Sequence, residues 1–157
     1  MEDSKFWCAR ANAIQMQADF IRHAVDQIDA ERFSEFLEDA DLVKSIADDT
    51  RQNGPGASAE LRSQALSRSK KIRKECDAIY RRQGGNYVTY LLGGVAQALK
   101  FAAKKQGGSS FEENVALSDA VYETKLSRGL CDYKSDYLQE LKWQRQRASE
   151  IVNEYAV

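Results

Sequence analysis

A single proline, Pro55, occurs in this chain of 157 residues, and it lies between Gly54 and Gly56. Because proline interrupts helices, its near-absence allows long stretches of the chain to be helical. Apolar residues recur at three- and four-residue spacing, and no stretch shows the period of two that indicates a strand. The sequence therefore predicts an all-α fold, a single-domain helical bundle of about five to six helices over residues 1–157.

Glycines and polar capping residues set the expected helix boundaries. Ser58 follows the Gly-Pro break, Asn86 follows a glycine pair, and Ser110 begins the Ser-x-x-Glu spacing of a capping box. The acidic run 39–41 is compatible either with one continuous second helix or with two shorter helices. The expected helices are 4–28, 30–51, 58–83, 87–106, 110–128 and 134–155. They group into acidic N-terminal helices over 1–53, basic central helices over 58–106 and C-terminal helices over 110–155.

The composition argues against several classes of protein. Three cysteines without a C-x-x-C pair make a disulfide framework a poor fit and favour a reducing compartment. The most apolar stretch, residues 87–103, is too short and too polar to span a bilayer, and the N-terminus has no signal-peptide pattern. We therefore expect a cytoplasmic protein with no membrane association.

No pattern in the chain indicates catalysis. His23, the only histidine, is expected on the polar side of the first helix, exposed and solvated. The acidic residues between Glu35 and Asp49 are expected to form a solvated face, and the glycine pairs lack a nucleotide-binding spacing. The prediction is a protein that is not an enzyme, with no catalytic residue, no metal and no cofactor. An enzyme with an unrecognised site remains an alternative, and a bound metal or cofactor would favour it.

Charge is strongly segregated along a chain whose net charge is only −1. Residues 1–53 hold twelve acids and six bases, residues 54–110 hold three acids and eleven bases, and residues 111–157 hold nine acids and six bases. A segment with a net charge of +8 attracts phosphate backbones, because neutralising phosphates releases their counterions. The central segment is therefore the candidate nucleic-acid-binding region, with a solvated basic face as the alternative.

Two helices of this segment carry the basic residues. On the third helix, Lys70, Lys74 and Arg81 lie opposite the apolar stripe that contains Ile72 and Cys76. The expected nucleic-acid-binding residues are Arg68, Lys70, Lys71, Lys74, Arg81, Arg82, Lys100, Lys104 and Lys105. Gly93, in the middle of the fourth helix, indicates a close approach to the backbone, either by another helix or by a sugar–phosphate chain.

Three further residues are candidates for a partner interface. Trp143 is expected on the polar face of the last helix, together with Arg147, where a large aromatic side chain indicates a contact with a partner. The alternative is that Trp143 folds over Arg147 or covers an edge of the bundle. Arg10 falls inside the apolar stripe of the first helix, either as a snorkelling or salt-bridged side chain or as a buried interface arginine.

Three segments together match the pattern of one family. The fourth helix contains Gly94, Val95, Leu99, Phe101 and Lys104, the last helix contains Leu-x-Trp-x-x-x-x-Ala at residues 141–148, and the first helix contains Arg10-Ala11 near its start. These segments resemble the small subunits of CRISPR effector complexes, the Cmr and Csm types especially, or the small subunit of a type I complex, with Val95 where leucine is usual in that family.

The resemblance implies an all-helical, non-catalytic subunit that stacks with copies of itself. Such subunits contact guide RNA and target nucleic acid through basic faces, without reading sequence, and they bind other effector-complex subunits. The alternative from a different class is a helical protein–protein interaction module, such as a phage or regulatory protein, with no nucleic-acid binding.

Overall fold

The computed structural model describes residues 2–56, 58–104, 115–129 and 135–154, and every regular element in these ranges is helical. The elements are α1 (Glu2–Asp29), α2 (Glu35–Asn53), the short 3-10 helix η1 (Gly54–Gly56), α3 (Ala59–Gln83), α4 (Tyr87–Ala103), α6 (Val115–Ser127) and α7 (Ser135–Glu154). The predicted all-α helical bundle is confirmed. None of the helices in the described ranges is both long enough and apolar enough to cross a membrane.

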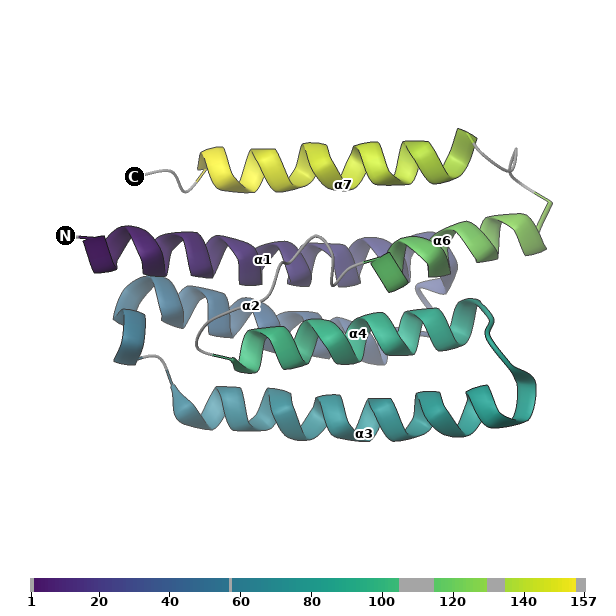
Figure 1. Ribbon diagram of the computed structural model, residues 1–157, viewed down its shortest axis with the longest axis horizontal. Helices are drawn as coiled ribbons and strands as arrows, with labels where there is room; N and C mark the ends of the chain where they lie inside the picture. The colour runs from purple at the N-terminus through teal and green to yellow at the C-terminus, as the bar shows by residue number, and fades with distance from the viewer. Residues whose placement is uncertain (1, 57, 105–114, 130–134, 155–157) are drawn as a thin grey trace.

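The helices run side by side along the long axis of the molecule (Figure 1). α3 forms one edge of the bundle and α7 the opposite edge, with the other helices between them. α1 packs along α2, α3 packs along α4, and α6 joins the two pairs through contacts with both α1 and α4. α7 contacts only α1 and α6 among the described helices, and α3 contacts only α2 and α4.

The predicted caps at Ser58 and Asn86 are confirmed. The Ser58 hydroxyl accepts a hydrogen bond from the backbone N–H of Leu61 at 3.3 Å, at the start of α3. The Asn86 side chain accepts hydrogen bonds from the backbone N–H groups of Val88 and Thr89. The Thr89 hydroxyl accepts a hydrogen bond from the backbone N–H of Asn86, which completes a capping box. Gly84 has a φ of +74°, so the chain reverses within residues 84–86 and α4 returns alongside α3.

The core is centred on α4, which is buried on nearly all sides. Leu91, Leu99 and Phe101 are each at most 1% exposed, and they join one cluster with apolar residues of α1, α2, α3, α6 and α7. Gly94 lies where α4 crosses α6, because a Cβ at this position would lie 2.5 Å from Cγ of Leu117. This glycine therefore permits a close helix–helix contact.

The acidic run does not split the second helix, because α2 is continuous through residues 39–41. Residues 30–34 form a turn before α2 begins at Glu35. The described part of the fourth helix ends at Ala103, earlier than expected. The predicted capping box at 110–113 lies outside the described residues.

The expected orientation of the last helix is wrong. The apolar side chains of Leu138 and Val152 are 55% and 48% exposed, whereas Glu140 and Gln144 are buried. α7 can bury these polar side chains because they have partners: His23 of α1 lies 2.8 Å from Glu140, and the Gln144 amide donates to Glu140. His23 is correspondingly partly buried, not exposed as expected.

Candidate nucleic-acid interface

A groove of about 370 Å³ runs between α3 and α4. Its lining residues are Leu66, Ser69, Lys70, Arg73, Lys74, Gln97 and Lys100. Three of the sequence-predicted binding residues, Lys70, Lys74 and Lys100, are therefore brought together from two helices. Arg73, which is not among the predicted binding residues, adds a fourth cation.

Helical periodicity explains why the α3 cations converge. Residues separated by three or four positions share a helix face, so Lys70, Arg73 and Lys74 project to the same side of α3. The hydroxyl of Ser69 donates a 2.6 Å hydrogen bond to the carbonyl oxygen of Ala96 and fixes α3 against α4 at this level. Lys100, one turn further along α4, reaches the same groove from the facing helix.

Gly93 of α4 faces α3 beside the groove. A Cβ at Gly93 would lie 3.6 Å from an Nη atom of Arg73 and 3.9 Å from Sγ of Cys76. Both distances are ordinary van der Waals contacts, so Gly93 is not required by a close approach of another helix; the tight helix crossing is at Gly94. Burial raises the pKa of the Cys76 thiol, which donates a hydrogen bond to the carbonyl oxygen of Thr89.

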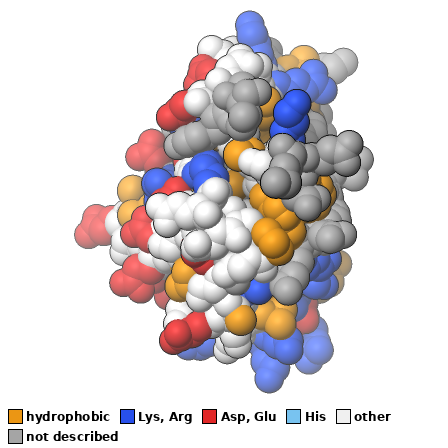
Figure 2. All heavy atoms as spheres, turned by 90° about the vertical axis from the view of Figure 1, so that its left-hand side faces the viewer, with side chains coloured by type: hydrophobic (Ala, Val, Ile, Leu, Met, Phe, Trp, Pro, Cys, Tyr) orange, Lys and Arg blue, Asp and Glu red, His pale blue; other side chains and the backbone are white. Residues whose placement is uncertain are grey.

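The cations of the groove are exposed and form no salt bridges with the carboxylates that the structure describes. These are Lys70, Arg73, Lys74 and Lys100, which we call the groove cations. Like charges in proximity raise the local positive potential, and a groove with low-dielectric walls concentrates it. Figure 2 views the bundle end-on and shows Lys and Arg side chains gathered at the bottom, the side on which α3 lies in Figure 1.

Three other predicted residues of α3 lie outside the groove. Lys71, Arg81 and Arg82 are all exposed, but none of them lines it. Arg81 lies seven residues beyond Lys74, so it shares the face of Lys74 about 10 Å further along the helix axis, beyond the groove. These side chains extend the positive charge of α3 but do not converge with the groove cations.

Arg68 has an intramolecular role. Its guanidinium donates to the buried carboxylate of Asp39 on α2 at 2.9 Å and lies 3.7 Å from Glu35. Burial raises the pKa of Asp39, and the Arg68 hydrogen bond and charge oppose that effect in part. The Asp39 carboxyl in turn raises the pKa of Arg68. Arg68 therefore joins α3 to α2, and Asp39 is not part of a solvated acidic face as expected.

Lys104 and Lys105 do not join the groove cations either. The Lys104 side chain is exposed beside a small, separate cavity that Trp7 and Pro55 also line. Lys105 lies outside the described residues.

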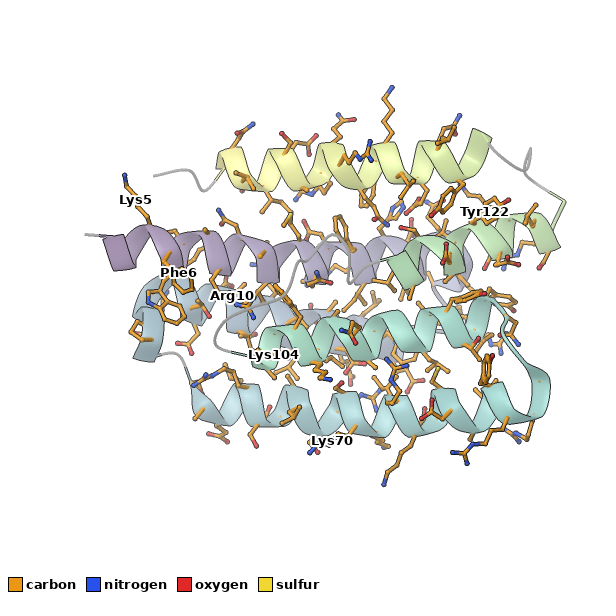
Figure 3. The ribbon with its side chains drawn as sticks, in the orientation of Figure 1. Lys5, Phe6, Arg10, Lys70, Lys104 and Tyr122 are labelled. Atoms are coloured by element: carbon orange, nitrogen blue, oxygen red, sulfur yellow. The ribbon has the colours of Figure 1, made fainter. Side chains whose placement is uncertain are left out.

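Arg10 is a buried intramolecular cap. Its guanidinium donates to the carbonyl oxygens of Phe101 at 2.7 Å and Lys104 at 3.0 Å, and its Cζ lies 4.0 Å from the centroid of the Phe101 ring. Figure 3 shows Arg10 on α1 beside the end of α4. Because the carbonyl oxygens at a helix C-terminus carry a partial negative charge that favours a cation, this contact holds α4 to α1.

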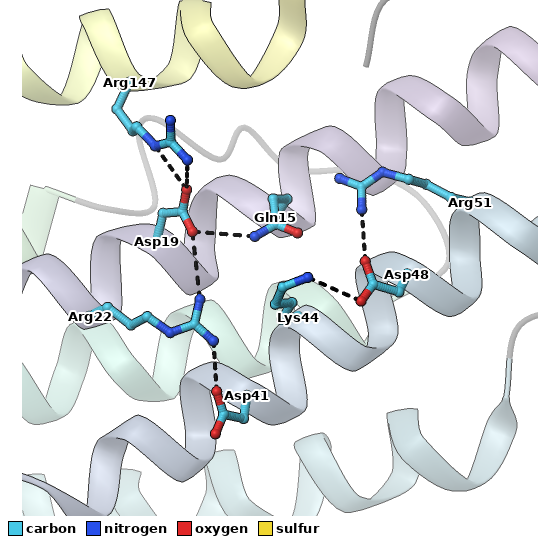
Figure 4. Close-up of polar contacts among 8 residues, drawn as sticks. All are labelled: Gln15, Asp19, Arg22, Asp41, Lys44, Asp48, Arg51 and Arg147. Carbon is cyan, nitrogen blue, oxygen red and sulfur yellow. Dashed lines mark hydrogen bonds and ion pairs between the residues drawn. The ribbon is translucent and has the colours of Figure 1, made fainter. Parts of the chain in front are cut away.

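Trp143 and Arg147 also make contacts within the chain. The Trp143 ring stacks on His23 at a centroid distance of 3.6 Å and lies 6.0 Å from Phe20, so it covers an edge of the bundle and does not lie on a polar face. Arg147 pairs with Asp19 of α1 at 2.8 Å (Figure 4). The expectation of an outward-facing Trp143 is wrong, because α7 turns that face toward α1.

No group of three or more His, Cys, Asp or Glu side chains in the described ranges is placed to hold a metal ion. No family model, no curated protein and no solved structure matches the chain at a significant level. The candidate site therefore rests on the residues of the groove and their geometry.

Proposed function

We propose that the groove between α3 and α4 binds the phosphate backbone of nucleic acid without reading base sequence. The observation that carries this proposal is the convergence of Lys70, Arg73, Lys74 and Lys100 on one groove, with no salt bridge to a described carboxylate. Ammonium groups act on phosphates as point charges and position a nucleic acid without discriminating between bases.

The setting we propose is that of a non-catalytic small subunit of a CRISPR effector complex. The resemblance of the fourth and last helices to that family supports this assignment, as does the all-helical fold. Guide RNA and target nucleic acid would then be the ligands of the groove. Other effector subunits and further copies of this chain would be its protein partners, because a bundle with basic and acidic regions suits head-to-tail stacking.

Removing the groove cations tests the binding proposal. The triple variant Lys70→Ala/Lys74→Ala/Lys100→Ala should bind a fluorescein-labelled oligonucleotide of any sequence more weakly, as measured by anisotropy at several salt concentrations. Each lost phosphate contact should flatten the slope of log K against log[salt] by about 0.7 for a single strand, so about two units in all for three contacts.

The matched control removes equal charge elsewhere. Lys71, Arg82 and Lys142 are exposed and do not line the groove, so their triple alanine variant should retain most of the affinity and of the salt slope. If both triple variants lose the same affinity, binding follows net charge and the groove has no special role. If neither variant differs from the original protein, the groove is not where the oligonucleotide binds. If the original protein does not bind it at all, the helical interaction module without nucleic-acid binding is the better explanation.

The CRISPR assignment has a separate test. Affinity purification of the tagged protein from its native cells should recover the large subunits of an effector complex together with guide RNA. Recovery of neither, while the groove still binds oligonucleotides, would leave the binding proposal in place and refute the assignment.

A further inference from the structure

Two exposed aromatic side chains lie at the end of the α3–α4 hairpin. Tyr80 is 60% exposed and Tyr90 is 36% exposed, which is high for large rings in a helical bundle. Both lie beside Gly85: the position of a Cβ there would be 3.6 Å from the Tyr90 hydroxyl oxygen and 3.7 Å from Cε2 of Tyr80. The absence of a side chain at Gly85 therefore leaves room for the two tyrosines next to each other.

The tyrosines continue the line of the groove. Tyr80 follows Arg73 by seven residues on α3, and Tyr90 precedes Gln97 by seven residues on α4. Seven residues are close to two helical turns, so each tyrosine lies on the same face as its groove residue, about 10 Å further along the axis. Gly93 lies between Tyr90 and Gln97 and adds no side chain to the path.

We propose that Tyr80 and Tyr90 stack unpaired bases of a single strand whose phosphates lie along the groove cations. This inference rests on the proposed function of the groove. From Lys70 to Tyr80 the α3 axis rises about 15 Å, the length of about four nucleotides of a stacked strand. The combination of a positive groove with aromatic rings is what binds single strands without sequence preference, because every base has a face that can stack.

The arrangement favours a single strand over a duplex. In a duplex the bases are paired and stacked inside, so exposed tyrosine rings gain nothing from them. A groove of about 370 Å³ is at the small end of ligand pockets, which suits a nucleotide's sugar and phosphate but not a double helix. Duplex binding would therefore use the cations alone.

Asp77 offers an independent check on the path of the strand. It is exposed on α3, between Arg73 and Tyr80 in the sequence, so a bound phosphate chain would pass close to its carboxylate. Asp77→Asn should therefore tighten binding of a single strand several-fold at low salt. The matched change Glu60→Gln, an exposed acid in the first turn of α3, should alter it little. Equal effects of the two changes would place the strand elsewhere.

The decisive experiment compares two tyrosine variants on two probes, a labelled dT12 strand and a labelled 12-base-pair duplex. Tyr80→Leu/Tyr90→Leu removes the rings but keeps apolar side chains of similar exposure, and it should weaken dT12 binding about tenfold or more. Its duplex affinity and its salt slope should not change. Tyr80→Phe/Tyr90→Phe keeps the rings and should bind dT12 like the original protein, and circular dichroism should show that both variants are folded.

The outcomes separate the two proposals. If the leucine variant binds dT12 normally while the groove triple variant does not, the groove function stands and the stacking role is refuted. The same refutation follows if the original protein prefers the duplex. If it binds neither probe, or if polyglutamate competes as well as unlabelled dT12, the proposed function itself fails and the groove suits an acidic protein segment.

Discussion

The bundle has two charged regions that differ in what their cations contact. Across α1, α2 and α7, the cations drawn in Figure 4 each face a carboxylate: Arg22 pairs with Asp41, Arg51 with Asp48, and Arg147 with Asp19. Along the α3–α4 groove, Lys70 and its neighbours form no salt bridge with any described acid. The first set of charges is neutralised by folding, whereas the second leaves its potential available to a ligand.

This contrast shows why net charge is a poor guide to binding. Exposed ion pairs such as Arg22–Asp41 contribute only about 0–1 kcal/mol each to stability. Their effect is to cancel charge locally. The groove differs because its cations come from adjacent turns and a facing helix, where acids are sparse.

Trp143→Ala should have the largest effect on stability. Trp143 packs on His23 and Phe20 and attaches α7 to the paired region. Truncating a large aromatic side chain in the core costs about 3–5 kcal/mol, and the partial exposure of Trp143 reduces this to about 3 kcal/mol. Urea unfolding followed by far-UV circular dichroism measures the loss. A change below 1 kcal/mol would mean that the ring contributes little to packing within the chain.

The neighbouring glycines of α4 compare its core side with its groove side. Gly94→Ala should destabilise the protein by about 2 kcal/mol, since its Cβ would overlap Leu117 at 2.5 Å. Gly93→Ala places a Cβ 3.6 Å from Arg73, an ordinary contact, and should be neutral or stabilise by up to about 1 kcal/mol through helix propensity. Thermal unfolding midpoints of the two variants, measured side by side, should move in different directions or by clearly different amounts.

Arg68→Ala should cost about 1–2 kcal/mol at neutral pH, because it leaves the buried Asp39 carboxylate without its arginine partner. Burial raises the pKa of Asp39, so the folded protein protonates this group more readily than the unfolded chain does. The penalty of the buried charge is therefore present above that pKa and is relieved as the pH falls through it. The difference in free energy of unfolding between the variant and the original protein, measured by urea titration, should therefore decrease from pH 7 to pH 5 and again to pH 4.

Replacing Lys70, Lys74 and Lys100 by alanine should have the smallest effect on folding. These side chains are exposed and form no described salt bridge, so stability should change by no more than about 0.5 kcal/mol. The same triple variant should lose oligonucleotide binding. A stability loss above 1 kcal/mol would show that these lysines serve the fold, and the contrast between the two regions would disappear.

Local signals in the sequence predicted much of the fold. Ser58 and Asn86 cap helices through contacts with the next turn, and Gly84 ends α3 with a positive φ that glycine adopts without strain. Each of these signals can be recognised without tertiary information. The orientation of α7 could not be recognised this way. Its buried face contains Glu140 and Gln144, which become acceptable inside only because His23 of a distant helix supplies a partner.

The candidate site was predicted only in part, because helical spacing identifies the residues of one face but not their partners on other helices. The spacing of Lys70 and Lys74 identifies a basic face, and Lys100 lies on the helix that packs against it. Arg73 is not opposite the apolar stripe of α3, so the position of that stripe does not identify it as a groove residue. Its position between Lys70 and Lys74, facing the side-chain-free Gly93, is the signal that the sequence contains. Arg68 could not be separated from the others, because its partner Asp39 belongs to another helix.

The Arg10 cap also has a consequence for the order of folding events. α1–α2 and α3–α4 are hairpins of sequence-adjacent helices, so each can pair early, whereas Arg10 and its acceptor Phe101 are separated by 91 residues. A contact this distant in sequence should form after the rate-limiting step. Arg10→Ala should then accelerate unfolding and leave the refolding rate nearly unchanged in stopped-flow experiments. Arg10 would thus slow unfolding, and so lengthen the lifetime of the folded protein, without affecting how fast it forms.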